Sequence, residues 1–152
     1  MTMKPVLFTL LMIPIFSAHA EPLKLGEPAP RLDVTLDDGS RANLGEFYDS
    51  GPTFIYFYPK ADTPGCTAQA CSLRDSHQRI VEAGVQVLGV SVDGVAAQSK
   101  FRSKLSLPFP LVADPDKHVV KAFGVPTRLG FSARQAYLVK DGRIAWRDTS
   151  AA

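Results

Sequence analysis

The chain has 152 residues, about one ordinary domain, and a formal net charge of +2. Hydrophobic residues make up 45% and charged residues 21%, which excludes a disordered chain, a collagen-like repeat and a multi-pass membrane protein. The weak basic balance, without a cluster of Lys and Arg, also argues against nucleic acid as a partner. The three histidines are scattered, so their spacing indicates no metal site.

Residues 1–20 have the layout of a secretory signal peptide. One lysine precedes an apolar run over 6–16, and Ala18-His19-Ala20 places small residues at −3 and −1 of a cleavage site. The alternative is an N-terminal membrane anchor, but a spanning helix needs about 20 apolar residues and this run has 11. We therefore expect export, and a mature domain over 21–152 that is not membrane-bound. Its location would be periplasmic or secreted, where thiols tend to form disulfides.

The mature chain begins with strand signals. The segment 21–31 holds three prolines and should be an extended lead-in. A pair of short strands is expected over 32–44, around an Asp-Asp-Gly-Ser turn. The β-branched and aromatic runs 54–58 and 85–92 fit strands buried on both faces of a sheet. The 26 residues between them are long enough for a crossover helix, which Gly84 is placed to end.

The second half continues this alternation. We expect a helix over 95–105, a short strand over 111–113, and a short helix capped by Asp116. A Lys-Asp-Gly-Arg turn then joins strands over 136–139 and 144–146 into a hairpin. Parallel crossovers followed by an antiparallel hairpin predict one α/β domain, with a mixed central sheet flanked by helices.

The chemical signal lies between Pro59 and Cys71. Thr63 is a good N-cap and Pro64 is favoured at the first helical position, so a helix should begin here. Cys66 then falls in the first turn, facing free backbone amides and the positive end of the helix dipole. That environment stabilises a thiolate, which is the nucleophilic form of cysteine. Cys71 follows further along the same helix.

Residue types alone leave three interpretations of this cysteine pair open. The first is a short-loop structural disulfide in an exported protein. The second is a disulfide exchanger, although that chemistry normally uses C-x-x-C and the spacing here is C-x-x-x-x-C. The third is a peroxide-reducing cysteine with a resolving partner, because a sulfenic acid condenses with a second thiol.

A family resemblance favours the third interpretation. The segment YPKADTPGCTAQACSLRD, residues 58–75, closely resembles the active-site segment of peroxiredoxins of the bacterioferritin-comigratory, or Q, type. It contains the P-x-x-x-T-x-x-C pattern of the whole superfamily. The segment GVPTRLGFSARQAYLVKDG, residues 124–142, also resembles this subgroup. The similarity runs from about residue 25 to 146 and implies a thioredoxin-like fold.

The resemblance implies a role for each matching residue. Cys66 would be the peroxidatic cysteine and Cys71 the resolving one. Thr63 would hydrogen-bond the sulfur and the peroxide through its hydroxyl. Arg134 would stabilise the thiolate and the charge on the leaving oxygen, a role that Lys fills less well. Pro59 would limit the access of solvent to the sulfur.

The implied activity is that of an atypical two-cysteine thiol peroxidase. It would reduce hydrogen peroxide and organic hydroperoxides, and a thioredoxin-like reductant would reopen the intramolecular disulfide. No metal, haem, flavin or nucleotide is implied. Arg128 is a rival to Arg134 as the catalytic arginine, but it lacks the strand that follows in the family. The alternative function is an exported binding or structural domain with an inert disulfide.

The sequence departs from the family pattern at its carboxyl end. Relatives continue beyond the last strand into a helix that covers one face of the sheet, and this chain stops soon after Trp146. We therefore expect the family's C-terminal helix to be missing and apolar sheet surface to be exposed. The expected state is a monomer or a weak homodimer.

Overall fold

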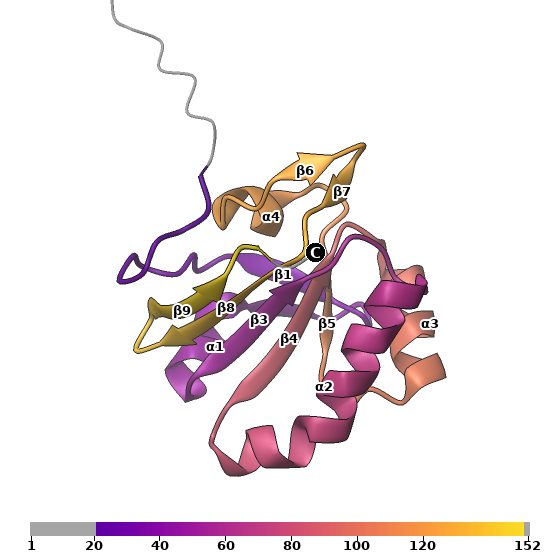
Figure 1. Cartoon of the computed structure of the whole chain (residues 1–152), viewed down its shortest axis with the longest axis horizontal. Helices are drawn as coiled ribbons and strands as arrows, with labels where there is room; N and C mark the ends of the chain where they lie inside the picture. Colours follow the sequence, from indigo (N-terminus) through magenta and orange to yellow (C-terminus); the bar gives the residue numbers. More distant parts are fainter. Residues whose placement is uncertain (1–20, 151–152) are drawn as a thin grey trace, which may run out of the picture.

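The computed structural model describes residues 21–150; the expected signal peptide, residues 1–20, lies outside this range. A seven-stranded mixed sheet runs through the domain in the order β2-β1-β5-β4-β3-β8-β9 (Figure 1). The central strands β3, β4 and β5 are parallel, and β1 and β8 pair antiparallel with them on either side. Over residues 21–150, no helix combines the length and the apolar character needed to cross a membrane.

The strands of this sheet are short, as expected for a small domain. They are β1 (Asp33–Leu36), β2 (Arg41–Asn43), β3 (Thr53–Phe57), β4 (Gln86–Ser91), β5 (Leu111–Ala113), β8 (Gln135–Lys140) and β9 (Arg143–Asp148). A separate two-stranded hairpin is formed by β6 (Thr127–Arg128) and β7 (Phe131–Ser132). The helices are α1 (Leu44–Ser50), α2 (Pro64–Glu82), α3 (Val95–Leu105) and α4 (His118–Ala122).

The helices cover the two faces of the sheet unequally. Helices α1 and α4 pack on one face, the α1/α4 face, where Leu44 and Val120 join a core built on Ile55 and Phe57. Helices α2 and α3 lie on the other, the α2/α3 face, at the right of Figure 1. Neighbouring residues of a strand point to opposite faces, so the aromatic run of β3 supplies both cores.

The α2/α3 face is left partly uncovered near the sheet edge. Strand β9 is the last element of the described residues, and no helix follows it up to residue 150. Trp146 on β9 is 47% exposed and lies against Phe54, with ring centroids 6.2 Å apart. An apolar hollow of about 450 Å³ adjoins Phe54, Leu73 and Ile80. Apolar groups of the sheet are therefore exposed to solvent here.

The sequence prediction is confirmed for the mixed sheet and for the long helices. Helix α3 and strand β5 have the expected bounds. Helix α1 and the β6–β7 hairpin were not expected. The predicted cap of α4 is wrong, because Lys117 occupies the N-cap position with φ 61° and makes no side-chain cap. Instead Asp114, directly after β5, accepts hydrogen bonds from the backbone amides of Val119 and Val120 in α4.

Candidate active site

The loop that leaves β3 is held in place before it reaches α2. The Tyr58 carbonyl accepts a hydrogen bond from Ser132 Oγ at 3.1 Å, and the Tyr58 amide donates to the Val90 carbonyl. Three residues further on, the Ala61 amide donates to Asp93 Oδ2 at 2.8 Å. These three contacts come from β7, β4 and the segment after β4. The loop therefore presents the start of α2 at the carboxyl end of the parallel strands.

Helix α2 begins as the sequence predicts, except for the cap. Thr63 is the N-cap with extended backbone angles, Pro64 takes the first helical position, and Cys66 lies in the first turn. The Thr63 carbonyl accepts from the Thr67 amide at 2.8 Å. The Thr63 hydroxyl makes no cap and donates to the Lys60 carbonyl at 2.8 Å. This bond uses the hydroxyl's only proton and leaves its lone pairs available to accept.

The Cys66 sulfur is almost completely buried and lies against a cation. Cys66 is 2% exposed and packs with the aromatic core of the α2/α3 face. Arg134, just before β8, donates from Nη2 to Cys66 Sγ at 3.3 Å. A guanidinium in this position stabilises a sulfur that carries negative charge. The contact joins two residues 68 positions apart in the sequence.

Gln69 is a site residue that sequence reasoning missed. Arg134 Nη1 donates to Gln69 Oε1, while Nη2 of the same guanidinium contacts Cys66. Gln69 lies three residues after Cys66, so both side chains share one face of α2. That i, i+3 spacing was a signal available in the sequence. Gln69 fixes the plane of the guanidinium toward the sulfur.

The floor of the site is aromatic and includes an unusual hydroxyl. Tyr56 is fully buried, and among the described residues its Oη has no hydrogen-bond partner. Burial raises the pKa of Tyr56 well above its usual value, and negative charge on Tyr58 or Cys66 raises it further. Tyr58, stacked on Tyr56, donates to Gln98 Oε1 at 2.5 Å. Both phenols therefore stay protonated and uncharged beneath the cysteine.

Cys71 lies on the same helix, and both cysteines are free thiols. Cys71 is half-buried. In one regular helix, a five-residue separation places the Cα atoms about 8.6 Å apart. A disulfide needs about 7 Å or less, so the two sulfurs cannot join while α2 is intact. Arg74, one turn further on, donates to the Leu105 carbonyl of α3 at 2.9 Å and pairs with Asp75.

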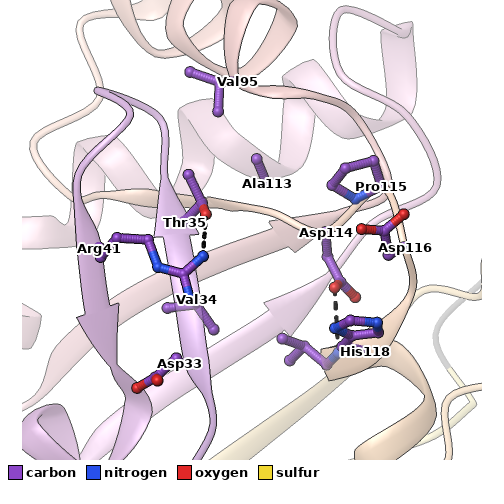
Figure 2. Close-up of a pocket in the computed structure, with 11 residues that line it drawn as sticks. Asp33, Val34, Thr35, Arg41, Val95, Ala113, Asp114, Pro115, Asp116 and His118 are labelled. Atoms are coloured by element: carbon purple, nitrogen blue, oxygen red, sulfur yellow. Dashed lines mark hydrogen bonds between the residues drawn. The ribbon is translucent and has the colours of Figure 1, made fainter.

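The remaining sequence candidates lie beside this centre. Pro59 is half-buried and lines an apolar hollow with the β6–β7 hairpin. Arg128 is exposed on β6, so the structure brings Arg134 and not Arg128 to the sulfur. A polar hollow of about 290 Å³ lies elsewhere, between β1 and the end of β5, and Figure 2 shows that it holds neither cysteine. Within residues 21–150, no group of His, Cys, Asp or Glu has metal-binding geometry.

The fold and the site together define a class of protein. A thioredoxin-like α/β domain holds a buried cysteine at a helix start, with an arginine on the sulfur and a second cysteine on the same helix. These are the features of thiol-based redox proteins. Residues 25–147 match the model of the AhpC/TSA family, and the chain belongs to that family.

Curated relatives lie in one branch of this family. The chain is 39% identical over 124 residues to a putative chloroplastic peroxiredoxin Q of Oryza sativa subsp. indica, covering 80% of this chain and 57% of that protein. It is 46% identical over 104 residues to peroxiredoxin Bcp of Escherichia coli K12, covering 68% of this chain and 66% of that protein. The chain thus spans little more than half the length of the rice relative.

Solved structures agree with this placement. Peroxidoxin BcpB from Mycobacterium tuberculosis superposes with a TM-score of 0.80 at 29% identity, over 84% of this chain and 86% of that chain. Peroxiredoxin Q from Xanthomonas campestris gives a TM-score of 0.74 at 29% identity, over 80% and 81%. The thioredoxin-like fold implied by the sequence is therefore confirmed.

Proposed function

We propose that this chain is a thiol peroxidase that reduces hydrogen peroxide and organic hydroperoxides. The observation that carries the proposal is the Arg134 guanidinium on the buried Cys66 sulfur, 3.3 Å away at the start of α2. A similar solved protein, the bacterioferritin comigratory protein of Xanthomonas campestris, is described by its alkyl peroxide reduction activity. That likeness supports the same chemistry here.

In the first step the Cys66 thiolate attacks one oxygen of the hydroperoxide. An S–O bond forms as the O–O bond breaks, and the other oxygen leaves with the electron pair. It takes up a proton and departs as water or an alcohol, while Cys66 becomes a sulfenic acid. Arg134 stabilises both the thiolate and the negative charge that develops on the leaving oxygen.

Thr63 acts in this step as an acceptor. Its hydroxyl proton is engaged by the Lys60 carbonyl, so its free lone pairs can accept from the O–H of a hydroperoxide. An oxygen held in this way is oriented toward the sulfur three residues further on. Pro59, in the same loop, keeps bulk water from Cys66, a residue that is 2% exposed.

In the second step Cys71 resolves the sulfenic acid. The Cys71 thiolate attacks the Cys66 sulfur, an S–S bond forms, and the hydroxyl group leaves as water after taking up a proton. A thioredoxin-like dithiol then reduces this disulfide and returns both cysteines to thiols. The complete cycle moves two electrons from the dithiol to the hydroperoxide.

The decisive test is thiol loss in the reduced protein after one equivalent of hydrogen peroxide. We expect fast, stoichiometric loss of both thiols in the wild type and none in Cys66→Ser. Cys71→Ser should react once and leave a sulfenic acid that excess peroxide over-oxidises. Slow thiol loss in the wild type would favour an inert structural pair. If only Cys71→Ser failed to react, the two roles would be reversed.

Export is a separate proposal, supported by the apolar run and the Ala18-His19-Ala20 signature in residues 1–20. We propose that the mature periplasmic or secreted protein begins at Glu21. Intact-mass measurement of the protein from the periplasmic fraction tests this. A full-length mass in the membrane fraction would favour an N-terminal anchor.

A further inference from the structure

The β6–β7 hairpin places two large apolar side chains in solvent beside the candidate active site. Leu129 at its tip is 89% exposed and Phe131 is 40% exposed. Single exposed apolar residues are common on protein surfaces and need no explanation. These two belong to one six-residue hairpin, residues 127–132, and lie over an apolar hollow.

The backbone at the hairpin tip gives a second observation. Leu129 has φ 51° and Gly130 has φ 83°, so both residues of the two-residue turn are left-handed. Such turns strongly favour Asn-Gly or Asp-Gly, because a leucine Cβ crowds the backbone in this conformation. An Asn at position 129 would reduce both the strain and the apolar exposure. Leucine at this position adds both backbone strain and exposed apolar area. Its presence points to a contact that the side chain makes outside this fold.

The hairpin is connected directly to the reactive centre. Its inner side and Pro59 enclose a hollow of about 340 Å³ with a mainly apolar lining. Ser132 Oγ donates to the Tyr58 carbonyl in the loop that leads to α2. Ala133, which also lines the hollow, immediately precedes Arg134. A molecule docked on the hairpin would therefore lie beside the loop that leads to the helix carrying both cysteines.

Two cations border this apolar surface. Lys60 places its ammonium 5.7 Å from the centre of the Phe131 ring. Arg128, exposed on β6, lines the same hollow. An apolar centre with a cationic edge is complementary to an apolar surface that is flanked by acidic side chains.

We propose that the β6–β7 hairpin is the docking surface for the protein that reduces the Cys66–Cys71 disulfide. The partner is a dithiol protein with apolar and acidic side chains around its reactive cysteine. Leu129 lines the hollow but is 89% exposed, so a small hydroperoxide in the hollow would cover only part of its side chain. A macromolecule can bury the rest. This inference rests on the proposed peroxidase function.

The reaction at this surface is a dithiol–disulfide exchange. The partner's first thiolate attacks one sulfur of the Cys66–Cys71 disulfide, forming a mixed disulfide and releasing the other cysteine as a thiolate. The partner's second thiolate then closes the partner's own disulfide and releases the remaining cysteine. The chain gains two electrons and two protons, and the partner is oxidised.

The test compares two reductants on the same variant. Leu129→Glu should lower kcat/KM for thioredoxin, used as the protein probe, by about tenfold, since one residue at an interface centre often carries that much affinity. Its turnover with dithiothreitol should be unchanged, because a small dithiol needs no docking surface. Leu25→Glu is the matched control, since Leu25 is 64% exposed in the lead-in and should affect neither reductant.

A charge variant gives a second readout. Arg128→Glu should slow reduction by thioredoxin at low ionic strength, and the deficit should shrink as salt is added. Arg41→Glu, which removes an exposed arginine on β2, is the control and should show no such dependence. Equal behaviour of these two variants would contradict a docking role for the hairpin.

Several outcomes would overturn the proposal. Equal losses with thioredoxin and dithiothreitol would mean that the hairpin merely supports the active site. Unchanged turnover with thioredoxin, or a wild type that only dithiothreitol reduces, would exclude this docking. Loss only for a long-chain hydroperoxide would assign the surface to substrate, and a shift in oligomeric state would assign it to a second copy. Thiol loss with no reductant present tests the peroxidase function independently.

Discussion

The two faces of the sheet are built differently. On the α1/α4 face the core is continuous: side chains from β3, β4, β5 and β8 meet α1, α4 and the amino-terminal lead-in. On the α2/α3 face the core is smaller and includes a group of packed aromatic rings. The edge of the sheet near Phe54 and Trp146 is open on this face. The chemistry lies on the less completely covered face.

Helix α2 is held on this face by few buried groups. Only Cys66 and Ala70 are fully buried among its 19 residues. Polar contacts to α3 supplement them: Arg74 of α2 donates to the Leu105 carbonyl, and Asp62, in the loop just before α2, pairs with Lys104 at 2.7 Å. Segments with little buried apolar area open at low free energy, whereas core strands open only with the whole domain. The comparison teaches that the helix carrying both cysteines can come apart while the sheet stays folded.

The largest expected effect is local unwinding on oxidation. The Cα atoms of Cys66 and Cys71 lie about 1.6 Å too far apart in a regular helix for a disulfide, and the two side chains point to nearly opposite sides. Oxidised protein should therefore lose amide-exchange protection over residues 63–73, with an opening free energy near zero. Strand β4 should stay protected in both redox forms.

Amide exchange followed by mass spectrometry on the reduced and oxidised protein measures this directly. The control is the reduced protein, in which α2 should be protected throughout. Equal protection of residues 68–73 in both forms, with the intramolecular disulfide confirmed by mass, would contradict the unwinding.

The second effect concerns the cation on the sulfur. Arg134→Lys keeps the charge but loses the planar guanidinium that reaches Cys66 and Gln69 together. Removing one preorganised donor typically costs about 10²–10³ in rate. Stopped-flow measurement of the second-order rate with hydrogen peroxide tests this. Arg128→Lys is the control, and a slow Arg128 variant beside a normal Arg134 variant would move the role to Arg128.

The sequence predicted the sheet well because its strands are marked by composition. Strands buried on both faces read as continuous β-branched and aromatic runs. Helix α1 was missed because it has only seven residues, although Asn43 caps it by accepting from the Gly45 amide. The β6–β7 hairpin was missed because its turn is Leu-Gly, and that pair is a weak hairpin signal.

Helix-start chemistry and the family resemblance predicted only part of the site. The start of α2 follows from Thr63 and Pro64 alone. That the Thr63 hydroxyl donates to the Lys60 carbonyl could not be predicted from these two residues. The contact of Arg134 with Cys66 joins residues 68 positions apart. The role of Arg134 was therefore predicted from the family pattern and not from local spacing. Similarly, the cap of α4 comes from Asp114 because the chain turns sharply at Lys117.

The third effect tests whether the α2/α3 face positions its arginine through Gln69. Gln69→Ala removes the acceptor that orients the Arg134 guanidinium. A hydrogen bond to a charged group contributes about 1.5–3 kcal/mol, and we expect about a tenfold loss in the rate with peroxide. Gln69→Glu, which keeps an acceptor, should recover most of it. Gln78→Ala, on the same helix but exposed, should react normally, and a similar loss there would indicate a general effect on α2.

The smallest effect belongs to the α1/α4 face and should leave the chemistry untouched. Asp114 is 5% exposed, and its oxygens accept from the amides of Val119 and Val120. Burial raises the pKa of Asp114, and these hydrogen bonds only partly oppose it. The native state therefore binds this proton at a higher pH than the unfolded chain does. The stability gained by binding this proton is complete below the unfolded pKa, about 3.9, and is lost as pH rises through the native pKa.

Asp114→Asn keeps one acceptor and cannot titrate. Urea unfolding of both proteins from pH 4 to pH 7 should show the wild type gaining stability relative to the variant as pH falls, by about 1 kcal/mol or less. Peroxide reduction should be equal in the two. Parallel stability curves would show that Asp114 does not titrate between these limits, and a loss of peroxide reduction would show that the two faces are coupled.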